Sequence, residues 1–119
     1  MSKLDVIKAT LETFGITFYG NANVKNTEPW DYTVFRRSVI ANAPNGTDFV
    51  RRYVVAIIRE NYVPEGLEFE VVKAIQDATN LRVSEASYSY VFKGSTDMVV
   101  EICTITFTEP LKRCKVLGE

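Results

Sequence analysis

The sequence predicts a single α+β domain spanning residues 1–119, with a mostly antiparallel sheet. The length of 119 residues is the usual size of one domain. The run FVRRYVVAIIR, Phe49 to Arg59, is rich in β-branched and aromatic residues and apolar on both sides, which is typical of a central strand. Segments of helical and of two-residue period surround it. They predict the order helix, strand, strand, helix, strand, strand, with a possible extra short strand near Ile16.

The composition is that of an ordinary globular protein. Hydrophobic residues make up 46% of the chain, charged residues 24%, and the formal net charge is -1. Neither a basic excess that would bind nucleic acid nor an acidic tail is present. The first 60 residues carry eight basic and six acidic side chains, and the rest carry six and nine. The resulting charges of +2 and -3 could favour head-to-tail contacts between copies, although chance also explains so small a difference.

The chain has no feature of a membrane protein. Its amphipathic start is unlike a signal peptide, and no run reaches the roughly 18 apolar residues of a transmembrane helix. We therefore expect a protein that is cytoplasmic where it is made. Cys103 lies in a predicted strand and Cys114 in a polar tail, without metal-site spacing, so both are interpreted as reduced thiols.

Alternation in the central strand divides its side chains between two faces. One face has Phe49, Tyr53, Val55 and Ile57, and the other has Val50, Val54, Ala56 and Ile58. Both faces need cover from other parts of the chain.

An amphipathic helix is predicted near the N-terminus. Ser2 is a good N-cap, with Asp5 at the third helical position, and Gly15 follows the helix, which ends near Phe14. Its apolar stripe consists of Leu4, Ile7, Leu11 and Phe14. Core packing explains this stripe better than a partner-binding or membrane-surface helix does, because the opposite face is of mixed charge.

A polar loop, Gly20 to Pro29, follows the possible edge strand Ile16 to Tyr19. Loops of this length often function through contacts. Trp30, the only tryptophan, stands at its end. An exposed tryptophan here would anchor an interface, whereas a buried one would cap the sheet.

A hairpin is expected next, from the strand Asp31 to Ala41 through the turn Ala43 to Gly46 into the central strand. Each strand carries an arginine pair, Arg36 with Arg37 and Arg51 with Arg52, and a turn centred on residue 44 would place Arg37 opposite Arg51. Like charges in that position repel. The arginines would then form a basic patch for phosphate or for an acidic neighbouring subunit. In the alternative, Asp31, Asp48, Glu60 or a helix glutamate neutralises them.

The second half predicts a helix and a second hairpin. Leu67, Phe69 and Val71 alternate like a strand, but the longer apolar pattern to Ala78 and the acidic start favour a helix ending at Asn80. The strand Leu81 to Phe92, the loop 93–97 and the strand Met98 to Thr108 follow, with Pro110 ending the last strand and a polar tail after it. Ala86, Tyr88, Tyr90 and Phe92 share one face, which sheet packing explains better than nucleic-acid stacking does.

The sequence contains little that would indicate an enzyme. The chain has no histidine and none of the common nucleotide, nucleophile or zinc motifs, so we predict no catalytic residue, cofactor or metal site. Glu101 stands among apolar residues and could be half-buried as a catalytic acid is, but pairing with an arginine explains it better. A small ligand-binding or enzymatic α+β domain, with a pocket near Glu101 and the tyrosines, remains the alternative.

The layout resembles the small tail-terminator and head-tail joining (tail completion) proteins of long-tailed bacteriophages. The resemblance covers nearly the whole chain: an N-terminal helix SKLDVIKATLETF, then ITFYGN leading into a polar loop, the strand WDYTVFRR, a helix, and a closing hairpin that ends in ITFTEP. Such proteins are non-enzymatic and typically form hexameric rings that cap the tail tube and face the head connector. They have no catalytic motif from which a residue role could be transferred.

The resemblance implies a virion assembly protein, present in the host cytoplasm during assembly and then at the head-tail junction of the virion. Its expected partners are further copies in a ring, the tail-tube protein, and a head connector or head-closure protein, with neither membrane nor specific nucleic-acid binding. Its function would reside in repeated heterologous interfaces. The candidate interface residues are Trp30, Arg36, Arg37, Arg51 and Arg52, with the loop Gly20 to Pro29.

Overall fold

The computed structural model describes residues 2–22 and 28–118 and has the predicted α+β class in one small domain. Its elements are α1 (Lys3–Glu12), β1 (Thr17–Tyr19), β2 (Tyr32–Asn42), β3 (Phe49–Glu60), α2 (Leu67–Thr79), β4 (Arg82–Phe92), β5 (Val99–Leu111) and α3 (Arg113–Leu117). The short strand expected near Ile16 is β1. The short helix α3 was not predicted, because the sequence indicated only a polar tail.

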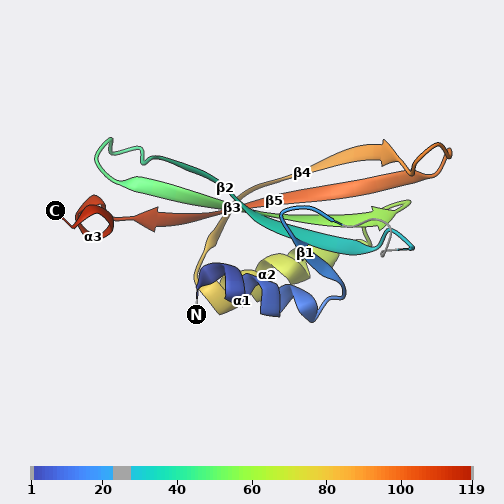
Figure 1. Ribbon diagram of the computed structural model, residues 1–119, viewed down its shortest axis with the longest axis horizontal. Helices are drawn as coiled ribbons and strands as arrows, with labels where there is room; N and C mark the ends of the chain where they lie inside the picture. The colour runs from blue at the N-terminus through green and yellow to red at the C-terminus, as the bar shows by residue number, and fades with distance from the viewer. Residues whose placement is uncertain (1, 23–27, 119) are drawn as a thin grey trace.

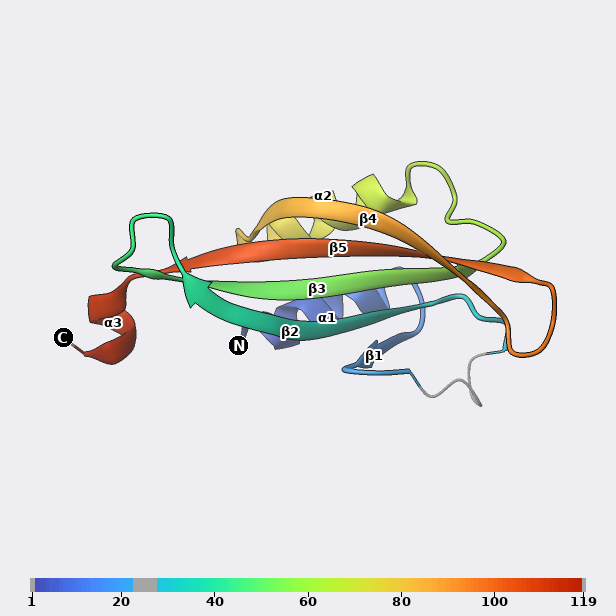
Figure 2. The same cartoon turned by 90° about the horizontal axis from the view of Figure 1, so that it is seen from above.

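One five-stranded sheet, in the order β1-β2-β3-β5-β4, organises the domain. The two predicted hairpins, β2 with β3 and β4 with β5, join through antiparallel pairing of β3 with β5, so β3 is the central strand as predicted. The sheet is mixed, because β1 pairs with β2 in parallel. Since β5 returns between β3 and β4, it leaves β4 at the sheet edge (Figure 2).

Both long helices cover the same face of the sheet (Figure 1). Ile7 and Leu11 of α1 and Val71 and Ile75 of α2 are buried against one side of the strands, including Val55. The predicted capping box is present: the Asp5 N–H donates to Ser2 Oγ at 3.2 Å, and the Ser2 N–H donates to Asp5 Oδ2 at 3.3 Å. The predicted helical stripes therefore form the main core.

The opposite face has a smaller apolar cluster. Tyr32, Ile58 and Val100 are buried there, and Trp30 and Phe18 pack against them. The sequence required cover on both sides of β3. The helices supply it on one side only, and on the other the cover comes from β1 and from the segment preceding β2.

An arm of the sheet extends beyond the helices. The molecule measures 54 × 26 × 26 Å along its principal axes, and Figure 1 shows the β2–β3 hairpin, the end of β5 and α3 projecting past α1 and α2. The prediction that Pro110 ends the last strand is wrong, since β5 continues to Leu111. Beyond Thr108, β5 has no β4 neighbour, and a proline without an N–H is tolerated at such an edge.

The predicted register of the first hairpin is also wrong. Arg37 lies opposite Tyr53, and Arg51 lies opposite Ile40. The predicted turn forms, with Gly46 N–H donating to Ala43 O, but the loop extends to residue 48, where Asp48 O accepts from Ala43 N–H. A register shift between Arg37 and Ile40 adds to the displacement. The two arginine pairs are therefore not directly opposite each other.

Among the described residues, no helix is both long and apolar enough to cross a membrane.

Candidate interaction surfaces

The five candidate interface residues lie at two opposite ends of the sheet. Trp30 precedes β2, beside the end of β3, whereas the four arginines lie toward the arm, with Arg37 still beside α1. Of the arginines, Arg37 and Arg51 are on the helix-bearing face, and Arg36 and Arg52 are on the opposite face. The structure therefore does not bring Trp30 and the arginines into one site. Of the predicted interface loop, residues 23–27 lie outside the described residues.

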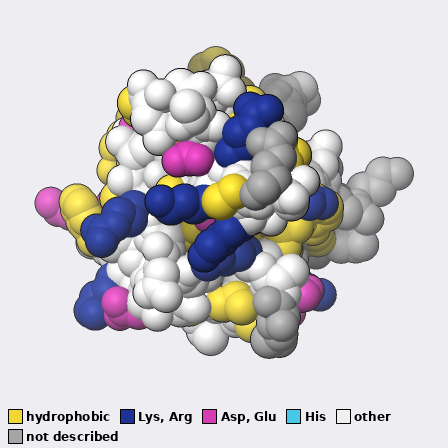
Figure 3. All heavy atoms as spheres, turned by 90° about the vertical axis from the view of Figure 1, so that its left-hand side faces the viewer, with side chains coloured by type: hydrophobic (Ala, Val, Ile, Leu, Met, Phe, Trp, Pro, Cys, Tyr) yellow, Lys and Arg dark blue, Asp and Glu magenta, His cyan; other side chains and the backbone are white. Residues whose placement is uncertain are grey.

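The arm is strongly basic. Arg52 of β3 lies opposite Thr108 of β5, and Thr108 lies opposite Arg82 of β4. Arg82 therefore adds a positive charge that the sequence did not associate with this end. Lys112, Arg113 and Lys115 follow β5 directly. Figure 3 looks along the long axis onto this end, where Lys and Arg side chains gather.

One carboxylate at the base of the arm compensates part of this charge. Glu109 lies opposite Arg51, with its Oε1 4.0 Å from Arg51 Nη1, and it accepts a hydrogen bond from the Tyr53 hydroxyl at 3.2 Å. Its Oε2 lies 3.7 Å from Lys3 Nζ, and Lys3 also donates to Thr79 O at the end of α2. Glu109 therefore links β3, β5 and α1.

Glu109 is not among the acidic residues that the sequence analysis expected to neutralise the arginines. Asp48 accepts from the main-chain N–H of Arg113, and Glu60 and Asp31 lie at the far end. Within the described part of the chain, Arg36, Arg37 and Arg52 form no ion pair with a carboxylate. These three arginines therefore carry charge that the described residues do not pair, Arg36 and Arg52 on one face of the sheet and Arg37 on the other.

The opposite end of the sheet is predominantly acidic. Glu28 and Asp31 precede β2, Glu60 ends β3, Glu101 lies near the start of β5, and Asp97 stands in the β4–β5 loop. The protein is therefore polarised along its 54 Å axis, from a basic arm to an acidic end.

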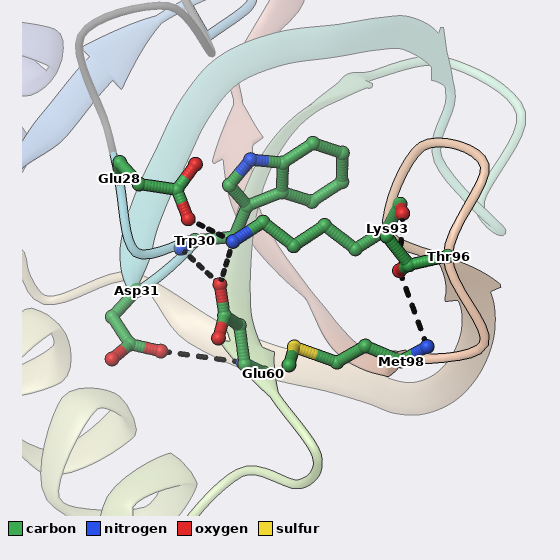
Figure 4. A network of polar contacts seen from close by, with 7 residues as sticks. All are labelled: Glu28, Trp30, Asp31, Glu60, Lys93, Thr96 and Met98. Atoms are coloured by element: carbon green, nitrogen blue, oxygen red, sulfur yellow. Dashed lines mark hydrogen bonds and ion pairs between the residues drawn. The ribbon is translucent and has the colours of Figure 1, made fainter.

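Trp30 belongs to a network at this acidic end (Figure 4). Its main-chain N–H donates to Glu60 Oε1 at 2.9 Å, and Lys93 Nζ lies 2.5 Å from the same oxygen and 5.9 Å from the centroid of the indole ring. Lys93 also binds the carboxylate of Glu28. The network ties the segment before β2 to the β4–β5 loop, while Trp30 itself stays half-buried.

The charges of this network stabilise one another. Hydrogen bonds to Glu28 and Glu60 raise the pKa of Lys93 above its ordinary value. The hydrogen bond from Lys93, together with that from the main-chain N–H of Trp30, lowers the pKa of Glu60. Trp30 thus partly caps the sheet, as one sequence interpretation expected, and it also lies beside a charged cluster.

The tyrosines of β4 do not pack in the core, contrary to the sequence prediction. Every residue of β4 is exposed. Hydroxyl groups on this strand nevertheless reach carboxylates: Tyr88 donates to Glu68 Oε2 at 3.1 Å, and Tyr90 is hydrogen-bonded to Glu101. Burial of the Tyr88 hydroxyl, together with its hydrogen bond, raises the pKa of Tyr88 to about 12. The edge position of β4 explains the difference, because α1 and α2 pack against the more central strands.

Glu101 and Glu68 have structural partners. Glu101 Oε1 accepts from the Val63 N–H at 2.8 Å, and Glu68 Oε1 accepts from the Gly66 N–H at 2.8 Å. Both carboxylates therefore hold the connection between β3 and α2. The expectation that an arginine pairs with Glu101 is not met among the described residues, where Glu101 forms no ion pair.

The two cysteines are free and occupy different environments. Cys103 is buried and Cys114, in α3, is exposed. Burial raises the pKa of the Cys103 thiol, and the nearby carboxylates Glu68 and Glu101 raise it further. The described residues contain no group of three or more histidine, cysteine, aspartate or glutamate side chains that could hold a metal ion.

No protein-family model matches this chain, and no curated protein is significantly similar to it.

Two features of the surfaces were missed in the sequence: the Glu109 contacts and the Lys93 network. Both depend on long-range placement, since Glu109 meets Arg51 only through the β3–β5 register, and Lys93 meets Glu28 and Glu60 only when two loops converge.

Proposed function

We propose that the chain is a non-enzymatic structural protein of virion assembly, of the tail-terminator or head-tail joining type found in long-tailed bacteriophages. Copies form a ring, with six as the expected number, that caps the tail tube and connects it to the head. The order of elements is compatible with the layout on which the resemblance rests, with β1 and α3 as additions.

The observation that carries this proposal is the charge polarity along the sheet. A basic arm and an acidic end on one elongated chain are complementary between successive copies, which favours head-to-tail contacts. Head-to-tail contacts are heterologous, and they close into a ring when the rotation between copies permits. This polarity differs from the slight charge asymmetry between the halves of the sequence, since Arg82 and Lys112 of the second half lie toward the arm and Glu28 and Glu60 of the first half lie at the acidic end.

The remaining surfaces are suited to partners in such an assembly. Arg36, Arg37 and Arg52 project from the sheet of the arm without a carboxylate partner among the described residues. The acidic end has exposed apolar surface beside it, including Phe92 and Met98. In this proposal the ring presents one side to the tail-tube protein and the other to the head connector or head-closure protein.

The proposal is tested by mass measurement and electron microscopy. Purified protein is analysed by light scattering at several concentrations and then mixed with tail-tube protein. We expect oligomers of defined size and rings at the ends of tubes. A protein that stays monomeric at high concentration and leaves the tubes unbound and uncapped contradicts the proposal.

The role of charge in self-association is tested by replacing arginines with glutamates. Arg36→Glu combined with Arg37→Glu should weaken self-association, and raising the salt concentration should weaken it in the unaltered protein, because exposed charges are screened over about 10 Å at 0.1 M salt. Lys73→Glu, at an exposed position of α2, is the control. Equal effects of the arm and control variants would contradict the head-to-tail arrangement.

A further inference from the structure

The sheet has two long edges without a neighbour in the described part of the chain. β4 forms one edge over residues 82–92, and all of its residues are exposed. At the other edge, β1 pairs only with Thr33 to Phe35 of β2. The outer half of β2, residues 36–42, therefore has β3 on one side and no described strand on the other.

The β4 edge lacks the features that usually prevent strand addition, whereas the β2 edge carries Arg36, Arg37 and a register shift beside its exposed apolar residues. Residues 86–92 of β4 contain neither a charged residue nor proline, and Tyr90 is 62% exposed and Phe92 63%. In the outer half of β2, Ile40 is 60% exposed beside Val39. A long, apolar, unprotected edge such as that of β4 readily pairs with another strand.

The directions of the two edge strands match. Because β2, β3, β5 and β4 alternate in direction across the sheet, β4 runs antiparallel to β2. A second copy in the same orientation therefore places its β2 antiparallel to β4 of the first. Ser87 is level with Val34 across the sheet, so the second copy is displaced along the strands until its residues 36–42 lie beside residues 86–92 of the first. The sheet then continues from copy to copy with its helices on one side.

Side chains and charges at the two edges are complementary as well. Arg37 and Ile40 of β2 lie on the helix-bearing face, as Tyr88 and Tyr90 of β4 do. Tyr88 binds Glu68, so carboxylates stand close to this part of β4. Pairing would cover exposed apolar side chains and bring Arg37 toward these carboxylates.

We propose that copies of this chain associate edge to edge, with the outer half of β2 of one copy adding antiparallel to residues 86–92 of β4 of the next. The contact uses main-chain hydrogen bonds for affinity and the edge side chains for register. It is heterologous, so each copy has one free edge of each kind, and successive copies form either a ring or a filament. The inference rests on the proposed self-assembly and specifies its contact.

The first test places a charge on each edge. Tyr90→Lys and Ile40→Lys should each weaken self-association roughly tenfold or more, because a lysine ammonium has to be desolvated when the edges pair. Phe69→Lys on α2 is the control, since Phe69 is 74% exposed and belongs to neither edge. Circular dichroism of each variant establishes that the monomer remains folded.

The second test is a disulfide between copies in a Cys114→Ser background. Chains with Ile40→Cys are mixed with chains carrying Tyr90→Cys or Tyr88→Cys under mild oxidation. At least one mixture should give disulfide dimers of unlike chains. Rapid like-with-like dimers of the Tyr90→Cys chain, without unlike dimers, would indicate symmetric β4 pairing and overturn the inference.

The outcomes separate this inference from the proposed function. If the unaltered protein is monomeric and leaves tail tubes uncapped, both are overturned. If it forms rings on tail tubes that neither edge lysine weakens and that no mixture cross-links, only the edge pairing is overturned.

Discussion

Replacing Ile75 by alanine, with Phe69→Ala as its counterpart, tests how α2 is oriented. Ile75 is 0% exposed and packs in the core beneath the sheet, whereas Phe69 is 74% exposed. If this segment were a strand, Leu67, Phe69 and Val71 would share the buried face. The two substitutions therefore distinguish the helix from the alternating pattern that the sequence also contains.

The expected loss follows from the buried carbons. Ile75→Ala removes the equivalent of three carbon groups at about 0.8 kcal/mol each, and the cavity adds to this, giving about 3–4 kcal/mol. Phe69→Ala should change the free energy of unfolding by less than about 0.5 kcal/mol. With a denaturant slope of about 1.5–2 kcal/mol/M, Ile75→Ala should lower the urea midpoint by roughly 2 M.

Urea unfolding followed by circular dichroism measures both values. Equal losses, or a larger loss for Phe69→Ala, would refute the placement of α2 described above. Ile75→Val, which removes one methyl group, provides an intermediate point at about 0.5–1.5 kcal/mol. A graded series from valine to alanine would indicate that packing at this position sets the stability.

Three further predictions concern individual groups. In the native protein, a thiol reagent should label Cys114 rapidly and Cys103 only on unfolding, as measured by mass spectrometry, because Cys103 is buried with a raised pKa. Titration of tyrosinate absorbance should include a late step near pH 12 that Tyr88→Phe removes. The neutral Tyr88 side chain stabilises the fold fully below its ordinary pKa of 10.0, and this stabilisation is lost as the pH rises through 12. Lys93→Met should lower stability at pH 7. Lys93 lowers the pKa of Glu60 from 4.5, so this pair stabilises the protein above pH 4.5, and that stabilisation is lost as the pH falls through the lowered pKa. In melting experiments at acidic pH, the Lys93→Met protein should therefore lose less stability than the unaltered protein.

Each of these predictions has a contradicting result. Simultaneous labelling of both thiols would mean that the strand bearing Cys103 opens readily. A Tyr88→Phe protein that retains the late titration step would assign it to another tyrosine. If Lys93→Met leaves the acid dependence unchanged, carboxylates elsewhere determine it.

Local patterns predicted the elements well. The capping box at Ser2, the stripe of α1, the helix that begins at Leu67 and the turn at Gly46 each depend on residues close in sequence. The two faces of the central strand also followed from alternation alone, since Val55 and Ile58 belong to the two different clusters.

Long-range relations were not available from those patterns. The hairpin register failed because Asn45 extends the loop, with its Oδ1 accepting from the N–H groups of Thr47 and Asp48, each at 3.0 Å. The exposure of β4 could not be foreseen, because its Tyr and Phe residues alternate as in a buried strand. Burial depends on which strand lies at the sheet edge, and the insertion of β5 beside β3 decides that.

The candidate surfaces were predicted in part. The arginines were recognised by composition, but their separation between two faces depends on the register of β2 with β3. Trp30 was recognised as the residue at the end of a long loop. Its position beside Lys93 depends on contact between segments more than 60 residues apart, as the 65-residue separation of Lys93 from Glu28 illustrates.

The position of Trp30 gives the protein an intrinsic optical reporter. It is the only tryptophan, so its emission arises wholly from the acidic end, with Lys93 and Glu60 as its charged neighbours. Emission should respond when the segment before β2 separates from the β4–β5 loop, and it should be insensitive to movement of the arm. Fluorescence and circular dichroism followed together during unfolding would therefore reveal whether the acidic end opens before the sheet does.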